Sequence, residues 1–184
     1  MTKTRLWQIL MLNLHRGSTA RGDWLRKKGV FAKMGKNVRY QIRGIPLYPE
    51  LISIGSNINL SSGVQLVTHD AIHLVFNELS KNESVVPEKV ECIEIKDNVF
   101  IGANCVILGG VRIGPNAIVS ANTLVNRDLA PGGIYGGVPA KRIGDFDELW
   151  EARKKGEYPT VERNQHISDD EIKKAWYYFD KKHG

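Results

Sequence analysis

Residues 95–130 read IKDNVF, IGANCV, ILGGVR, IGPNAI, VSANTL and VNRDLA, six consecutive units of six residues with no slip in register. The first position of each unit is Ile or Val, and the fifth is mostly small or branched. The fifth position and the next first position are two residues apart, so on an extended chain both side chains point to one side. Three earlier units share this register: MGKNVR from Met34, IGSNIN from Ile54 and LSSGVQ from Leu60. The pattern indicates short strands that each bury one face.

The fourth position of the unit indicates a sharp corner in the backbone. It holds only Asn, Gly or Asp, residues that tolerate a positive φ: Asn37, Asn57, Gly63, Asn98, Asn104, Gly110, Asn116, Asn122 and Asp128. Spacings of four and two residues do not keep side chains on one helical face, which excludes a helical repeat. A meandering antiparallel sheet would need alternating strands joined by two-residue hairpin turns, so the hexad repeat disfavours it. The pattern instead predicts a parallel coil with three units per turn and a triangular cross-section.

This repeat resembles that of the hexapeptide-repeat family over roughly residues 34–144. The resemblance implies an all-β solenoid, a left-handed parallel β-helix, with short N-terminal helices and a C-terminal helical extension. We therefore expect a basic helical cap at 1–33, the β-helix catalytic domain at 34–144 with a long loop at 71–93, and a helical extension at 145–184. The cap would cover the open end of the coil, because terminal repeats need capping.

Composition bounds the class of protein. The 184 residues are 42% hydrophobic and 25% charged, which is ordinary for a globular protein and argues against global disorder. No apolar run approaches the roughly 20 residues that span a bilayer, and no small-residue cleavage site follows the apolar stretch at 6–14. We therefore expect a cytoplasmic protein. Cys92 and Cys105 are too few and too far apart for a disulfide scaffold or a zinc knuckle.

The net charge of +6 is unevenly distributed. Residues 1–43 hold eleven Lys and Arg and one acid, Asp23, whereas the rest of the chain sums to −4. Such a basic block suits an anionic membrane surface, a phosphate-rich partner or nucleic acid, and a solvated basic face is an equal alternative. Nucleic-acid binding is not expected, because no recognition motif accompanies the charge. Peripheral membrane contact through the N-terminus stays open as a hypothesis.

The order of the motifs carries a resemblance in chemistry. Hexads are followed by Thr68-His69-Asp70, a long loop, and an unbroken run that ends in GGVPAKRI, which resembles the maltose and galactoside O-acetyltransferase branch of the family. The resemblance implies that His69 is catalytic, and histidine is a natural general base near neutral pH. His69 would take the proton of an acceptor hydroxyl that attacks the thioester of acetyl-CoA, by direct transfer in a ternary complex. Asp70 and His73 are further candidates, for orienting the imidazole and for contacting the acceptor.

The same resemblance implies the contacts of acetyl-CoA, the expected cosubstrate. Small residues would line the pantetheine arm, basic residues would meet the phosphates, and a proline would lie against the adenine: Gly102, Ala103, Ala121, Arg127, Lys141, Arg142 and Pro139. Phe100 stands where the family usually has Trp, so the acceptor pocket keeps an apolar platform without the indole N–H. The Asn that positions the acceptor in the sugar acetyltransferases is missing from residues 40–47. A simple maltose or galactoside acceptor is therefore not expected.

These residues predict an acetyl-CoA-dependent O-acetyltransferase acting on a sugar or glycan hydroxyl. Family members are trimers, which implies a homotrimer with active sites between subunits. Alternatives within the same fold are an N-acetyltransferase acting on an amino sugar nucleotide and a non-catalytic β-helix binding module. A zinc carbonic anhydrase of this fold would need three histidine ligands. The coil supplies only His69 and His73, so no metal is expected.

Overall fold

The computed structural model describes residues 3–81, 85–156, 158–160 and 166–184. The chain divides into two compact units, Met1–Phe146 and Asp147–Gly184. The first unit contains the repeat, two N-terminal helices and the long loop. The second contains most of helix α4 (Phe146–Lys154) and all of helix α5 (Asp169–His183).

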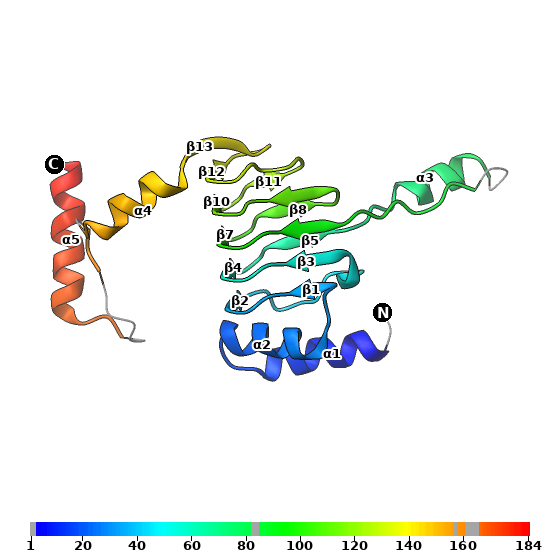
Figure 1. Cartoon of the computed structure of the whole chain (residues 1–184), viewed down its shortest axis with the longest axis horizontal. Helices are drawn as coiled ribbons and strands as arrows, with labels where there is room; N and C mark the ends of the chain where they lie inside the picture. Colours follow the sequence, from blue (N-terminus) through cyan, green and yellow to red (C-terminus); the bar gives the residue numbers. More distant parts are fainter. Residues whose placement is uncertain (1–2, 82–84, 157, 161–165) are drawn as a thin grey trace. The chain divides into compact units, whose positions relative to one another are not determined.

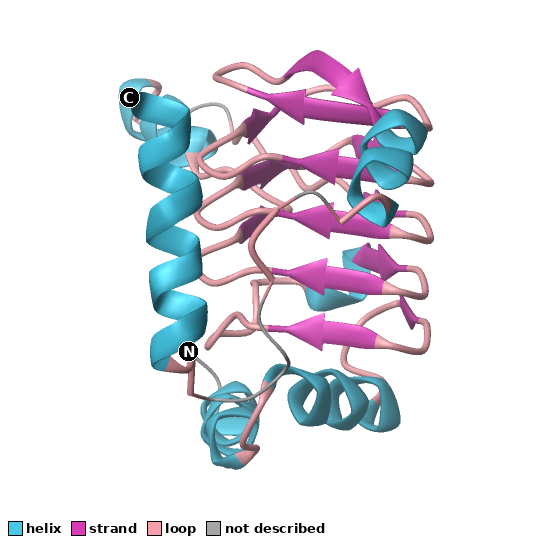
Figure 2. Ribbon diagram, turned by 90° about the vertical axis from the view of Figure 1, so that its left-hand side faces the viewer, coloured by secondary structure: helices cyan, strands magenta, loops and turns pink. Residues whose placement is uncertain are grey.

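Short strands of the repeat stack into three sheets, each taking strands from successive turns of the coil (Figures 1 and 2). The first sheet has the order β1-β3-β6-β9, with strands Lys33–Met34, Ile52–Ile54, Ile93–Ile95 and Val111–Ile113. The second begins β2-β4-β7-β10-β12, with strands Val38–Tyr40, Ile58–Leu60, Val99–Ile101, Ala117–Val119 and Gly133–Gly136. The third is β5-β8-β11, with strands Gln65–Val67, Val106–Leu108 and Leu124–Val125. All these pairs are parallel, which confirms the predicted parallel coil.

Equivalent positions of successive turns are paired in register inside the coil. In the first sheet Ile54 pairs with Ile95, and Ile95 with Ile113, and all three side chains are buried. Burying an aliphatic side chain of this size stabilises a fold by about 1.5–3 kcal/mol. Columns of branched side chains at the first and fifth positions of the hexads are therefore the main apolar core of the protein.

Asparagine side chains hold the corner between the first and second sheets. Asn37 Nδ2 donates to Asn57 Oδ1 at 2.9 Å, Asn57 Nδ2 to Asn98 Oδ1 at 2.9 Å, and Asn98 Nδ2 to Asn116 Oδ1 at 2.8 Å. All four residues have a left-handed backbone, with φ between 52° and 59°. The residues that turn the chain are thus also the residues that join successive turns, and we refer to them as the amide ladder.

The spacing of the amide ladder reveals where the chain leaves the coil. A turn of three hexads takes 18 residues, which is the separation of Asn98 from Asn116. Asn37 and Asn57 are separated by 20 residues, and Asn57 and Asn98 by 41. The additional residues are accommodated by an excursion at 42–51, which includes the 3-10 helix η1 (Pro49–Leu51), and by the long loop at 71–93.

The long loop is not wholly irregular, because it contains helix α3 (Ile72–Leu79), which projects from the coil (Figure 1). The helix begins where Asp70 Oδ1 accepts a hydrogen bond from the backbone N–H of Ile72 at 3.0 Å. Its large apolar side chains are 48–81% exposed in the single chain: Ile72, Leu74, Val75, Phe76 and Leu79. The sequence analysis expected a loop here, although Ile72, Val75, Phe76 and Leu79 recur at the spacing of one helical face.

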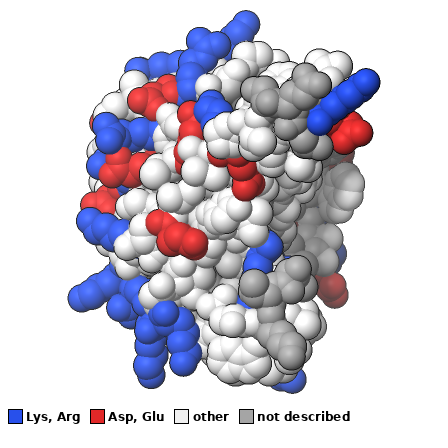
Figure 3. Space-filling view, turned by 90° about the vertical axis from the view of Figure 1, so that its right-hand side faces the viewer, with Lys and Arg blue, Asp and Glu red and all other residues white. Residues whose placement is uncertain are grey.

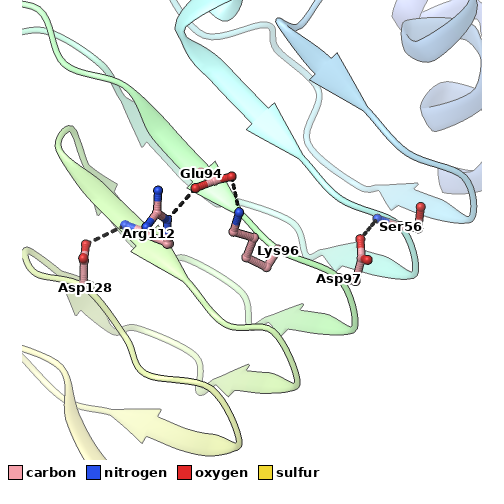
Figure 4. A network of polar contacts seen from close by, with 6 residues as sticks. All are labelled: Ser56, Glu94, Lys96, Asp97, Arg112 and Asp128. Atoms are coloured by element: carbon pink, nitrogen blue, oxygen red, sulfur yellow. Dashed lines mark hydrogen bonds and ion pairs between the residues drawn. The ribbon is translucent and has the colours of Figure 1, made fainter.

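Asp128 departs from the predicted corner. The other eight fourth-position residues have a positive φ, and Asp128 does not. Its carboxylate instead accepts a hydrogen bond from the backbone N–H of Arg112 at 2.7 Å, as Asp97 accepts from the backbone N–H of Ser56 at 2.7 Å (Figure 4). An aspartate therefore joins two turns by binding a backbone N–H rather than by turning left-handed.

Charged side chains on the outer face of the first sheet also link the turns. Glu94 lies between Lys96 and Arg112 and binds one cation through each carboxylate oxygen (Figure 4). Hydrogen bonds from Lys96 and Arg112 hold the pKa of the Glu94 carboxyl below its usual range. These side chains are 30–63% exposed, so solvent screens the pairs and they stabilise the coil only slightly.

Both ends of the coil are closed by other elements. Helices α1 (Lys3–Leu14) and α2 (Ser18–Lys28) lie at its first turn, where Leu12 and Leu25 are fully buried (Figure 2). At the other end, strand β13 (Lys141–Asp145) returns antiparallel to β12. The parallel coil therefore ends before residue 144, because the turn at 137–140 reverses the chain.

The second unit contains a capped helix. Ser168 Oγ accepts a hydrogen bond from the Glu171 N–H at 3.3 Å, and the Glu171 carboxylate accepts from the Ser168 N–H at 2.8 Å, so both residues cap the start of α5. Among the residues described in both units, no helix has the length and apolarity needed to cross a membrane.

We expect Asn98→Ala to destabilise the coil more than Asn98→Gly. Both substitutions remove two ladder hydrogen bonds, each worth about 1 kcal/mol, but only alanine adds the cost of a left-handed backbone, about 1 kcal/mol or more. Urea unfolding measures the difference. Asn126→Ala, which changes an exposed asparagine outside the ladder, is the control. Equal stabilities of the Ala and Gly variants would contradict the expected backbone cost.

Candidate active site

His69 follows strand β5, at the point where the coil gives way to the long loop. The backbone N–H of Glu91 donates to the carbonyl of Thr68 at 2.7 Å, and His69 forms an antiparallel bridge with Val90. The two ends of the loop are therefore paired with each other. His69 is fixed in this short ladder at the base of the loop rather than on a free segment.

A cleft of about 470 Å³ opens beside the base of the loop, and His69 forms part of its wall. The other lining residues come from the ends of third-sheet strands, the next corner and the loop base: Val67, Thr68, Asp70, Lys89, Glu91, Leu108, Gly109, Gly110 and Asn126. Lys89 Nζ binds Glu91 Oε2 at 2.9 Å, and this hydrogen bond raises the pKa of Lys89. The cleft thus places an ammonium group, two carboxylates and an amide around one imidazole.

One nitrogen of the His69 ring is inaccessible to solvent. Nδ1 is buried and has no hydrogen-bond partner among the described residues. Tyr48 packs against the ring edge-to-face, with ring centroids 5.5 Å apart and planes at 86°, a geometry that aromatic pairs favour. A molecule in the cleft can therefore exchange a proton with His69 only through Nε2.

Asp70 does not orient the imidazole, contrary to the hypothesis drawn from the sequence. Its Oδ1 accepts the hydrogen bond from the Ile72 N–H that begins α3, while His69 Nδ1 lacks a partner. An aspartate readily accepts a hydrogen bond from the backbone N–H two residues further on, and this local bond competes with any contact to a neighbouring side chain.

Three residues around His69 were missed by sequence reasoning: Tyr48, Thr68 and Glu88. Thr68 Oγ1 donates to the Leu47 carbonyl at 2.7 Å, and Tyr48 OH donates to Glu88 Oε2 at 3.0 Å. The bond to Glu88 raises the pKa of Tyr48. The excursion at 42–51 is thus tied both to the strand that carries His69 and to the long loop. The sequence signal for these contacts is the segment IRGIPL at 42–47, which interrupts an early turn of the repeat.

Neither His73 nor Phe100 lines the cleft of His69. His73 lies on α3, and its Nδ1 is buried with no partner in the described part of the chain. Phe100 lies on the outer face of the second sheet, in a separate hollow of about 240 Å³ that also includes Arg39 and Ile118. Within one chain the structure therefore does not assemble these candidate acceptor contacts into one site. No cluster of three or more metal-ligating side chains occurs among the described residues.

The small residues expected along the pantetheine arm lie at the corner between the second and third sheets. Gly102 packs so closely on the next turn that a Cβ would lie 2.5 Å from the backbone nitrogen of Ala121. Ala103 is partly exposed and Ala121 exposed. This corner precedes β8, whereas Gly109 in the His69 cleft follows it. The small-residue corner and the cleft are therefore at opposite ends of the third-sheet strands.

The basic residues and the proline lie near the last turns of the coil. Arg127 and Lys141 are exposed, and Pro139 is partly buried in the turn before β13. Arg142 Nη2 donates to Asp145 Oδ2 at 2.9 Å and to the Gly132 carbonyl at 3.2 Å. Arg142 thus already has partners within the chain, whereas Arg127 and Lys141 point their charges to solvent.

Cys105 is unsuited to act as a nucleophile. It is fully buried at an inward position of the coil, and its Sγ donates to the Ser120 carbonyl at 3.0 Å. Burial raises the pKa of the Cys105 thiol, which disfavours the reactive thiolate. Cys105 is therefore not a candidate for carrying an acetyl group.

Residues 93–127 match the family model described as bacterial transferase hexapeptide (six repeats). Over 135 residues the chain is 32% identical to the Bacillus subtilis (strain 168) protein named "Putative acetyltransferase YvoF", and the match covers 72% of each chain. The chain belongs to the hexapeptide-repeat acetyltransferase family. A 2,3,4,5-tetrahydropyridine-2,6-dicarboxylate N-acetyltransferase of Staphylococcus aureus (strain JH9) is 41% identical over 70 residues, which are 38% of this chain and only 29% of that protein.

Solved structures of hexapeptide-repeat acetyltransferases share the fold. A maltose O-acetyltransferase from Clostridium difficile 630 has a TM-score of 0.56 and 26% identity, over 78% of this chain and 86% of that one. A galactoside acetyltransferase in complex with coenzyme A has a TM-score of 0.51 and 23% identity, over 91% and 92% of the two chains. Membership of this family implies the left-handed sense of the coil.

Proposed function

We propose that this protein is an acetyl-CoA-dependent O-acetyltransferase that acetylates a sugar or glycan hydroxyl, with His69 as the general base. The observation that carries the proposal is the setting of His69, whose imidazole forms the wall of a polar cleft and can exchange protons only through Nε2. Lys89, Glu91 and Asn126 offer the donors and acceptors that a polyhydroxylated acceptor needs.

In the proposed reaction, His69 Nε2 removes the proton of the acceptor hydroxyl as its oxygen attacks the thioester carbonyl. The carbon–oxygen bond forms, the carbon–sulfur bond breaks, and the imidazolium returns the proton to the departing sulfur. No acyl-enzyme is needed, so a ternary complex must bring both substrates to the cleft. A correctly placed base of this kind accelerates a reaction by about 10²–10⁴-fold.

The residues proposed for acetyl-CoA suit its chemistry. The narrow corner at Gly102, Ala103 and Ala121 lets an extended pantetheine arm approach the backbone, and the exposed cations of Arg127 and Lys141 suit its phosphates. Two solved relatives were determined with bound coenzyme A or acetyl-coenzyme A, the galactoside acetyltransferase and a Vibrio cholerae O1 biovar eltor acetyltransferase. The contributions of Arg142 and Pro139 remain proposals of the same kind, as do acceptor contacts by His73 and Phe100.

N-acetylation is the second candidate activity. It is favoured by the Staphylococcus aureus relative, which is named as an N-acetyltransferase and is 41% identical over 70 residues. An amino sugar nucleotide would use the same base and the same cosubstrate. Parallel assays with sugars and with amino sugar nucleotides distinguish the two acceptor classes, because only the correct class releases CoA thiol at a rate that depends on His69.

We expect His69→Ala to lower the rate of CoA thiol release by about 10²–10⁴-fold with little change in KM for acetyl-CoA, because the imidazole acts on the acceptor proton. His183→Ala, on helix α5 of the second unit, is the matched control and should retain the wild-type rate. A fully active His69→Ala variant would refute the assignment. Absence of a thermal shift with CoA would favour a binding module instead.

We further propose that the enzyme is a homotrimer with active sites between subunits. In one chain the small-residue corner at Gly102 and the cleft of His69 are at opposite ends of the third-sheet strands. A neighbouring subunit that placed its corner beside this cleft would complete the site. The flat faces of a three-sided coil suit closed threefold packing.

Turnover per subunit should fall when the enzyme is diluted below its trimer dissociation constant, because monomers would lack half of each site. Sedimentation velocity over the same concentration range measures the assembly. Loss of activity and loss of the trimer should coincide. A fully active monomer would contradict shared active sites.

We also propose that the enzyme is cytoplasmic and contacts an anionic membrane through its N-terminal end. Helix α1 turns Leu6, Trp7, Leu10 and Leu14 away from the coil, and these side chains are 51–65% exposed. Lys and Arg side chains gather at the same end of the molecule (Figure 3). An apolar face beside clustered cations suits an anionic lipid surface, where a lipid-linked glycan acceptor would be found.

The membrane proposal predicts co-sedimentation with vesicles that contain anionic lipid, and weaker binding at high salt because salt screens the charges. Trp7→Ala should reduce binding. Trp150→Ala, which removes a tryptophan of similar exposure, 56% against 51%, is the matched control. Equal binding to neutral and anionic vesicles would refute the electrostatic part of the proposal.

A further inference from the structure

Tyr48 has a strained backbone next to the proposed base. Its φ is 51°, in the left-handed region that side chains other than Asn, Asp and Gly rarely adopt. Such conformations are energetically unfavourable and persist where the surroundings impose them, often at functional sites. One such surrounding contact is the hydrogen bond that the Thr68 hydroxyl donates to the carbonyl of Leu47, the residue before Tyr48.

The ring and the hydroxyl of the Tyr48 side chain each make a contact. The ring packs edge-to-face on the imidazole of His69 at 5.5 Å between centroids, and the hydroxyl donates to Glu88 of the long loop at 3.0 Å. The phenol is thus held by a loop residue, and the carbonyl just before Tyr48 is held by Thr68, which follows strand β5. A ring fixed at both ends can restrict the rotation of the imidazole that it contacts.

His69 lacks the hydrogen bond that usually orients the ring of a catalytic histidine. A catalytic histidine is commonly oriented by a hydrogen bond from its second ring nitrogen to a carboxylate or a carbonyl. Here Nδ1 is buried without a partner among the described residues, and Asp70 is engaged by the backbone of α3. The edge-to-face contact with Tyr48 is therefore the interaction available to fix the plane of the imidazole.

We propose that Tyr48 is a positioning residue, whose ring fixes the imidazole plane of His69 in place of an orienting hydrogen bond. The bond to Glu88 is secondary, because the ring itself contacts the imidazole. The inference rests on the proposed function, since it concerns how the general base is aimed. It assigns a catalytic reason to the excursion at 42–51, because that excursion delivers the ring to His69. Glu88 acts one step further away, through the phenol.

A merely structural role predicts a different order of variants. If Tyr48 only tied the excursion to the long loop, loss of the bond to Glu88 would be the damaging event, and Tyr48→Phe would be as impaired as Tyr48→Gly. If the ring aims the base, Tyr48→Phe keeps the essential group and only the variants without a ring lose activity. The two roles therefore differ in the behaviour of the phenylalanine variant.

We expect Tyr48→Phe to keep most of the wild-type kcat, whereas Tyr48→Leu and Tyr48→Gly lower kcat by about 10–100-fold, the effect of a misplaced catalytic group. KM for acetyl-CoA should not change. Glycine adopts the left-handed backbone freely, so Tyr48→Gly keeps the test valid if the leucine variant is unstable. Tyr135→Phe, which loses a phenol hydrogen bond to the Ala130 carbonyl, is the matched control and should retain activity.

A double-mutant cycle with His69→Ala separates positioning from general stabilisation. In the His69→Ala background, Tyr48→Gly should cause no further loss of rate, because no imidazole is left to orient. A further loss of the same size, or wild-type kcat for Tyr48→Gly in the presence of His69, would overturn the positioning role while leaving the proposed function intact. Wild-type activity of His69→Ala alone would overturn both.

Discussion

Side-chain amides stacked at one corner of the coil set the constraint on which the rest of the structure depends. Each asparagine of the amide ladder can bind the next only if the two turns are in register, since the hydrogen bonds are 2.8–2.9 Å long. Register at the corner fixes register in the adjoining strands, and a slip of one residue would turn the buried side chains outward. The columns of Ile and Val, and hence the cleft walls built from successive turns, follow from this alignment.

The sequence was sufficient to predict whatever repeats. Hexads predicted the parallel sheets, the inward positions and eight of the nine left-handed corners, because each unit obeys the same local rule. Asp128 broke that rule because a carboxylate has an alternative partner, the backbone N–H of Arg112. The reversal at β13 also lay outside the rule, since it depends on a closing turn that occurs once.

The candidate site could be predicted only in part, because it is built where the repeat is interrupted. His69 was predicted from its place before the long loop, in a motif order that resembles the family. Its surroundings depend on contacts across 40 and 21 residues, Tyr48 to Glu88 and Thr68 to Leu47, which no local spacing encodes. Asp70 illustrates the same point. Its place next to His69 suggested a contact with the imidazole, but its carboxylate accepts from the backbone N–H of Ile72 at the start of α3.

The bond between Asn57 and Asn98 crosses 41 residues, yet it is no longer than the other bonds of the amide ladder. The coil therefore closes beneath the long loop as though the inserted segment were absent, and the loop is a side branch of the architecture. Substitution or exchange of that branch would cost the scaffold little free energy, because few of its side chains contribute to the core. Replacement of α3 would therefore leave the turns of the coil unchanged, whereas the base of the loop must be kept, because Val90 and Glu91 pair there with His69 and Thr68.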